Sequence, residues 1–134
     1  MGGPPGERAR LVVPGQPRGK GRPRFGGGRT YTDQATRAAE EAWQWAWRAS
    51  GRRMVVGHFR MALEVIHQQP KRPTSPYPKK PDLDNVAKLV GDALNGMAWT
   101  DDAYCQGLEA RKVYGPAAQV VLEWWPVPDA GRWA

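Results

Sequence analysis

Acidic side chains gather in one short part of this 134-residue chain, although the chain as a whole is basic. The stretch PDLDN places Asp82 and Asp84 two residues apart, and WTDD places Asp101 and Asp102 side by side. Hydrolysis of a phosphodiester requires an activated water, neutralisation of charge on the phosphate and help for the leaving oxygen. One or two Mg²⁺ ions, which prefer carboxylate oxygens, supply all three. The two acidic pairs are therefore candidate ligands of a divalent cation.

Charge is segregated along the sequence. Residues 1–31 contain seven basic residues and one acid, residues 68–81 contain four basic residues and no acid, and residues 82–109 contain six acids and one lysine. The net charge of +7 and the pI near 10.0 favour a polyanionic partner such as nucleic acid. Because carboxylates repel phosphate, an acidic segment in a chain that also has two basic segments favours a cation among those acids.

The acids lie around a segment with helical periodicity, and two interpretations of the first pair stay open. Asp82 and Asp84 can cap the helix, as a D-x-D pattern often does, or they can face one ion. If the strand after the second pair lies beside the helix entry, one acid of that pair, Asp101 or Asp102, completes the metal site. Lys88, one turn past Asp84, would then hold the scissile phosphate or stabilise developing negative charge. We expect Asp92 to pair with Lys88 at the i+4 spacing.

Two basic segments are candidate DNA contacts. PRGKGRPRFGGGRTY is rich in Gly and Pro and is expected to be a loop, in which alternating basic residues point to one side of an extended chain. QQPKRPTSPYPKKP contains five prolines, which exclude helix and discourage sheet. For both segments a solvated loop without a role is the alternative. The candidate phosphate contacts are Arg18, Lys20, Arg22 and Arg24 in the first segment and Lys71, Arg72, Lys79 and Lys80 in the second.

Periodicity and turn residues predict the elements that must position these side chains. They are a short strand near 11–13, a helix from Asp33 to Ser50 that Thr32 or Asp33 caps and Gly51 ends, a strand over 54–67, a helix from 82 or 84 to Gly96, and strands over 105–114 and 117–125 joined as a hairpin. The expected fold class is α+β: a single domain over 1–134 in which a small mixed β-sheet is packed by two helices. Residues 1–10 and 127–134 are expected to be loose ends.

Composition excludes several other classes of protein. The chain has one cysteine, Cys105, so it makes neither an internal disulfide nor a thiolate metal site. His58 and His67 pair with no cysteine and receive no metal role. No run of 18 apolar residues and no secretory signal are present, so we expect a cytoplasmic protein that does not enter a membrane. Most of the seven tryptophans are expected to pack in a core or a subunit interface.

Three stretches of the chain resemble the RusA family of Holliday-junction resolvases of bacteria and their prophages. They are PGQPRGKGRPRF, TYTDQAT and KKPDLDNVAKLVGDALNGMAWTDDAYCQGLEARKVYG, and the resemblance covers roughly residues 11–125. The family pattern is a D-x-D-N led by proline or basic residues, a lysine four residues after its second aspartate, D-A-L, a D-D pair before a strand and a K-x-Y-like end. The long third stretch contains all of these features.

The resemblance implies a homodimeric, Mg²⁺-dependent endonuclease that nicks two opposed strands of four-way junction DNA, with Mn²⁺ as a substitute ion. Asp82, Asp84 and Asp102 match the family's metal-binding acids, and Lys88 matches its catalytic lysine. The resemblance also implies a nucleoid-associated protein of bacterial or phage origin, with no small-molecule cofactor. A two-fold dimer would suit the two-fold symmetry of a junction. The Trp- and Gly-rich composition departs from the family, so no cleavage-sequence preference is carried over.

Two other functions are compatible with the same residues. A non-catalytic basic DNA-binding dimer would use the carboxylates only as helix caps. A metal-dependent nuclease acting on flaps, replication forks or RNA would use the same acids on a different substrate. A nicking assay with and without Mg²⁺ separates the first alternative, and a comparison of substrates separates the second.

Overall fold

The computed structural model describes residues 8–21, 24–26, 29–31 and 33–128, with side chains described for 8–21 and 33–128. Chain order gives the elements β1 (Ala9–Pro14), β2 (Arg24–Gly26), β3 (Arg29–Tyr31), α1 (Gln34–Ser50), β4 (Phe59–Gln68), α2 (Leu83–Leu94), the short 3₁₀ helix η1 (Asp102–Tyr104), β5 (Cys105–Gly115) and β6 (Gln119–Pro126). Within this part of the chain, no helix is long and apolar enough to cross a membrane.

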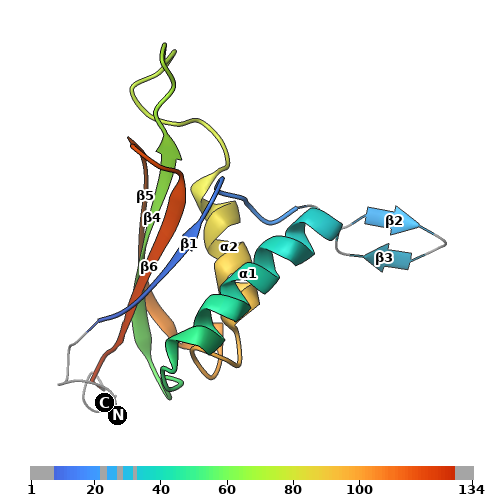
Figure 1. The fold of residues 1–134 in the computed structure, drawn as a ribbon. Helices are drawn as coiled ribbons and strands as arrows, with labels where there is room; N and C mark the ends of the chain where they lie inside the picture. Colours follow the sequence, from blue (N-terminus) through green and yellow to red (C-terminus); the bar gives the residue numbers. More distant parts are fainter. Residues whose placement is uncertain (1–7, 22–23, 27–28, 32, 129–134) are drawn as a thin grey trace.

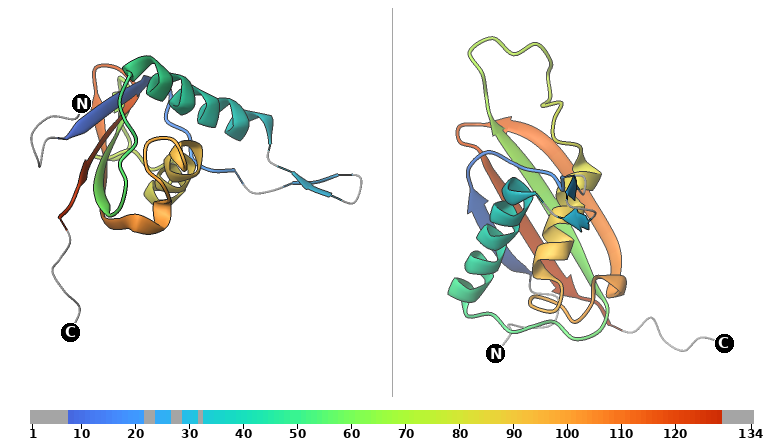
Figure 2. Two further views of the ribbon diagram at one scale, coloured as in Figure 1. Left: turned by 90° about the horizontal axis from the view of Figure 1, so that it is seen from below. Right: turned by 90° about the vertical axis from the view of Figure 1, so that its right-hand side faces the viewer.

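A four-stranded mixed sheet in the order β1-β6-β4-β5 forms one layer, and α1 and α2 together cover one of its faces (Figure 1). Strands β1 and β4 pair antiparallel with β6, whereas β4 and β5 run parallel. Parallel neighbours need a crossover connection, and α2 provides it between β4 and β5. The views in Figure 2 show that neither helix lies over the other face of the sheet. The α+β prediction with two packing helices is confirmed.

The core lies between the sheet and the two helices. Alternate residues of β4, from Phe59 to Val65, are buried on the helix side, as the period of two in a half-buried strand predicts. Apolar positions of α2 at helical spacing cover them, and Trp99 stacks on Phe59 with ring centroids 4.7 Å apart. On α1, Trp43 is buried and Trp45 is 67% exposed, as their two-residue separation on a helix requires.

Local signals predicted the helix boundaries correctly. The carboxylate of Asp33 accepts a hydrogen bond from the backbone N–H of Thr36 at 2.7 Å and so caps α1. Gly51 ends that helix with φ +66°, a left-handed conformation that suits glycine. Helix α2 ends at Leu94, and the chain turns at Gly96 with φ +77°. Thr32, the other expected cap of α1, lies outside the described residues.

Two expectations about the strands were wrong. β5 and β6 do not form a hairpin, because β4 lies between them and pairs with both. The Gly-rich segment expected to be a loop contains the two-stranded β2-β3 sheet, which projects away from the body of the molecule (Figure 1). Of the expected loose ends, residues 1–7 and 129–134 lie outside the described residues. Ala9 and Arg10 belong to β1, and the N–H of Val127 donates to the carbonyl of His58 at 3.1 Å.

Candidate active site

The first acidic pair lies at the start of α2, and its carboxylates are not used as caps. Asp82 is the N-cap residue, but its side chain makes no capping hydrogen bond. The first turn is held by its carbonyl, which accepts from the N–H groups of Asn85 and Val86 at 3.1 Å each. Asp84 lies in the first turn, and both acidic side chains are exposed. Of the two interpretations of D-x-D here, capping by the Asp82 side chain is therefore wrong.

The second acidic pair lies at the start of η1, beside the far end of α2. Asp101 caps η1, since its carboxylate accepts from the N–H of Ala103 at 3.0 Å. The backbone N–H of Asp102 donates to Oδ1 of Asn95 at 2.8 Å, and Asn95 is the residue that ends α2. This amide fixes η1 to α2. Its role was not predicted from the sequence, although an asparagine at a helix end is a recognisable capping signal.

Negative charge is concentrated around Asp102. Burial raises the pKa of its carboxyl above the ordinary value, and a side-chain hydrogen bond that its protonated form donates to Asp101, together with the charges of Asp101 and Asp92, raises this pKa further. The ammonium of Lys88 acts in the opposite direction and lowers it. A carboxyl whose ionisation is opposed by neighbouring negative charge, as that of Asp102 is, would be stabilised in its charged form by a bound cation.

The fold does not bring the two acidic pairs to one point. Among the residues that the structure describes, no three His, Cys, Asp or Glu side chains lie close enough together to hold a metal ion. A Cβ at Gly91 would lie 3.9 Å from Oδ2 of Asp102, which places that acid beside the third turn of α2. Gly91 follows Asp84 by seven residues, about 10 Å along a helix. The expectation that Asp82, Asp84 and Asp102 surround a common point is not met in this structure.

Lys88 links the two pairs along the exposed side of α2. It follows Asp84 by one helical turn, and it is close enough to Asp102 to lower the pKa of that carboxyl. The side chains on this side of α2 that could bind a metal ion are exposed carboxylates, and their oxygen atoms suit Mg²⁺. This ion is commonly held by one or two carboxylates together with water and substrate phosphate. The residues therefore fit a magnesium ion without needing a closed cluster of protein ligands.

The N-terminal basic segment lies against the start of α2. Gly19 packs on Pro81 and Asn85, and the N–H of Lys20 donates to the carbonyl of Asn85 at 2.9 Å. The side chain of Arg18 is exposed beside them. Among the other predicted contacts of this segment, Arg24 contributes its backbone to β2, and Arg22 lies outside the described residues.

Lys20 itself does not face solvent as the predicted alternation requires. Its ammonium pairs with Oε2 of Glu40 at 2.8 Å and with Oδ2 of Asp92 at 3.1 Å. The expected partner of Asp92 was Lys88, one turn earlier on the same helix. The structure pairs Asp92 with Lys20 instead, a contact between residues 72 positions apart that helical spacing cannot reveal.

The second basic segment is the long irregular loop between β4 and α2, which extends beyond the end of the sheet (Figure 1). Its four predicted contacts, Lys71, Arg72, Lys79 and Lys80, are all exposed. At the helix end of the loop, Nζ of Lys112 on β5 donates to the carbonyl of Lys79 at 2.7 Å. The loop and the N-terminal segment thus meet the same end of α2, next to Asp82.

A hollow on the sheet contains none of the predicted site residues. It measures about 470 Å³ and is lined by charged side chains of the sheet, among them Arg10, Glu64, Glu109 and Arg111. Glu64 and Arg111 form an ion pair across β4 and β5. We place the candidate site on α2 instead, because the predicted acids and Lys88 lie there with both basic segments at one end.

The family model described as Endodeoxyribonuclease RusA matches residues 14–123, which contain both acidic pairs and both basic segments. No curated protein matches the chain.

Proposed function

We propose that this chain, which belongs to the RusA family of endodeoxyribonucleases, cleaves four-way junction DNA as a Mg²⁺-dependent homodimer and nicks two opposed strands. Membership of the family makes the chain an enzyme that hydrolyses internal phosphodiester bonds of DNA. The junction, the metal ion, the paired nicks and the dimer are the further content of the proposal.

The position of Lys88 is the observation that supports this assignment most directly. It lies on the exposed side of α2 between the two acidic pairs, so a phosphate that it binds would have carboxylates on both sides. Asp82 and Asp84 at one end of α2 and Asp102 at the other are the residues that would hold one or two metal ions, which when bound supply Lewis-acid activation of water and of the phosphate. Lys88 would stabilise the negative charge that develops as the bond breaks.

The basic segments would bind DNA without recognising its base sequence. Arg18 and the pair Lys79 and Lys80 lie at the end of α2 that contains Asp82, so a strand held by them passes the first acidic pair. Contacts of this kind are made to phosphates and fix the position of DNA rather than its sequence. Selection among DNA shapes would then depend on two identical sites related by the two-fold axis of a dimer.

Cleavage of matched substrates tests the proposal. The wild-type chain is incubated with a four-way junction, a flap and a linear duplex at equal concentration, with Mg²⁺ or with EDTA. We expect nicks in opposed strands of the junction, in Mg²⁺ only, and much slower cutting of the other two. Equal rates on all three substrates would contradict junction selectivity.

The site is tested by Asp84→Asn, which keeps the shape of the side chain and removes its charge. Cleavage should fall more than about 100-fold, because loss of a metal ligand costs at least as much as loss of an outer-shell group. Junction binding in EDTA should be retained or become tighter, since a charge that repels phosphate is gone. Full cleavage by Asp84→Asn would remove this end of α2 from the site.

A further inference from the structure

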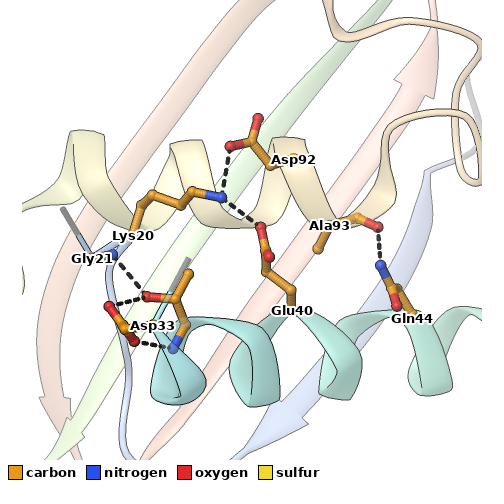
Figure 3. A network of polar contacts seen from close by, with 8 residues as sticks. Lys20, Gly21, Asp33, Glu40, Gln44, Asp92 and Ala93 are labelled. Atoms are coloured by element: carbon orange, nitrogen blue, oxygen red, sulfur yellow. Dashed lines mark hydrogen bonds and ion pairs between the residues drawn. The ribbon is translucent and has the colours of Figure 1, made fainter. Parts of the chain in front are cut away.

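The tripeptide Gly19-Lys20-Gly21 fastens the N-terminal segment to both helices at once, and Figure 3 shows the contacts of Lys20 and Gly21. The Lys20 ammonium lies between Glu40 of α1 and Asp92 of α2. The backbone of the same residue is bonded to Asn85 in the first turn of α2. The N–H of Gly21 donates to Oγ1 of Thr36 at 3.0 Å, which connects the segment to the cap of α1. Three consecutive residues thus tie one segment to the starts of two helices.

The ion pairs of Lys20 are more enclosed than ordinary surface pairs. The side chains of Lys20 and Glu40 are 19% and 18% exposed, and that of Asp92 is 35% exposed. Burial alone would lower the pKa of Lys20, but hydrogen bonds to Glu40 and Asp92 and the charges of both acids outweigh it and raise this pKa. The lysine is therefore held in its charged form by the protein itself, and two of its three N–H donors are already engaged.

The two glycines permit this close approach. A Cβ at Gly19 would lie 2.8 Å from Cβ of Asn85, and a Cβ at Gly21 would lie 2.1 Å from Oδ2 of Asp33. Both distances are shorter than van der Waals contact, so any side chain at either position would push the segment away from the helices. The residues on both sides of Lys20 thus have to be small for its side chain to reach both acids.

Packing beside the segment is incomplete, so the polar ties are important for holding it. A pocket of about 240 Å³ that is partly open to solvent lies beside the segment, and its lining includes Pro17, Trp43 and Leu89. Pro17 is buried, but apolar contacts do not fill this space. A second polar tie between the helices, from Nε2 of Gln44 to the carbonyl of Ala93 at 3.1 Å, lies further along them (Figure 3).

We propose that Lys20 is a positioning residue for DNA cleavage, which holds α2 against α1 and so keeps Asp84, Lys88 and Asp102 in place. It is not a phosphate contact. Lys20 also neutralises Asp92, which lies one turn past Lys88 and whose charge acts on Asp102. Loss of Lys20 would leave Asp92 and Glu40 without a partner and add net negative charge where phosphate must bind. The inference rests on the proposed site along α2.

Lys20→Met tests the inference when cleavage and binding are measured separately. At saturating junction in Mg²⁺, kcat should fall about 10- to 100-fold, the usual cost of losing a supporting residue. In EDTA, the slope of log affinity against log salt should not change, because the same number of phosphates is neutralised. Arg52→Gln, at an exposed position just after α1, is the matched loss of one positive charge and should change neither quantity.

A double-mutant cycle with Glu40 separates positioning from direct contact with DNA. Glu40→Gln alone should lower kcat in the same direction as Lys20→Met, and the two changes together should cost less than their sum. Lys20→Arg, which keeps a charge that both acids can bind, should restore most of kcat. If Lys20→Met unfolds, Glu40→Gln and Lys20→Arg still test the tie, because each leaves part of the network in place.

Two results would overturn the inference. The first is a salt slope that becomes shallower by about 0.9 in Lys20→Met, which would make Lys20 a phosphate contact. The second is an unchanged kcat in both Lys20→Met and Glu40→Gln. Either result leaves the proposed function intact as long as Asp84→Asn abolishes cleavage, so the two ideas fail separately.

Discussion

The two basic segments of this protein contact the same end of α2, but one has an enclosed lysine and the other has only exposed basic side chains. The N-terminal segment is fastened through Gly19, Lys20 and Gly21, and its lysine is enclosed by two carboxylates. The loop between β4 and α2 presents its four basic side chains to solvent, and Lys112 holds it at the carbonyl of Lys79. Two segments that are both rich in basic residues can therefore have different roles, because a lysine that pairs with acids of the protein is not available to bind DNA.

Among the substitutions that test this difference between the two segments, Gly19→Ala is expected to have the largest effect. Gly19→Ala places a Cβ 2.8 Å from Asn85, so the segment has to move away from α2. We expect a loss of about 1–3 kcal/mol in the free energy of unfolding, as for other overpacked sites, together with slower cleavage. Urea denaturation measures the first and the nicking assay the second. Thr74→Ala in the exposed loop is the control, and equal effects at the two positions would remove the distinction between the segments.

A smaller effect is expected from the loop, and it concerns binding rather than stability. Lys79→Gln with Lys80→Gln should make the dependence of log affinity on log salt shallower by about 0.9 for each phosphate that the loop no longer neutralises. The midpoint of urea denaturation should stay the same, because both side chains are exposed. Titration of fluorescent junction DNA at several salt concentrations in EDTA provides the measurement. An unchanged slope would remove these lysines from the DNA-binding surface.

The smallest effect is expected at the foot of the loop, where His67 lies on the buried side of β4 at 8% exposure. Burial lowers the pKa of this imidazole below 6.5, and the positive charge of Lys112 lowers it further. The unfolded chain therefore binds a proton at His67 that the folded chain resists, so stability is full above about pH 6.5 and decreases as pH falls below that value.

Denaturation by urea at pH 7.5 and pH 5.5 measures this loss of stability. His67→Gln removes the titrating group, so this variant should lose less stability between the two pH values than the wild type does. An identical loss in both proteins would show that other groups cause the acid sensitivity.

Local features of the fold were predictable from the sequence, whereas pairings between distant residues were not. Asp33 and Gly51 mark the ends of α1, because capping depends on residues within one turn. β4 pairs between β5 and β6 in the sheet. No short-range feature of the sequence indicates this pairing, and so the expected hairpin of β5 and β6 was wrong. The glycines of the β2-β3 segment suggested a loop where the chain forms two short strands.

In the candidate site, too, local features were predictable from the sequence and contacts between distant residues were not. The identities of Asp82, Asp84, Lys88 and Asp102 came from motif spacing, and the structure places all four along α2 or beside it. Their separation did not follow from spacing, because the position of Asp102 depends on its bond to Asn95 and on the path of the chain into β5. The pairing of Lys20 with Glu40 and Asp92 requires the two helices to be packed first, and no pattern in the sequence contains that information.

Mapping of the metal site by localised oxidative cleavage tests the central claim, that acids at both ends of α2 serve one cleavage site. Fe²⁺ is an oxygen-binding substitute for Mg²⁺, and with ascorbate and peroxide it cuts the peptide backbone next to the residues that bind it. In the presence of junction DNA, we predict cuts near Asp82–Asp84 and near Asp101–Asp102 alike, both suppressed by excess Mg²⁺. Cuts at one end of α2 only, or cuts that Mg²⁺ does not suppress, would contradict the claim.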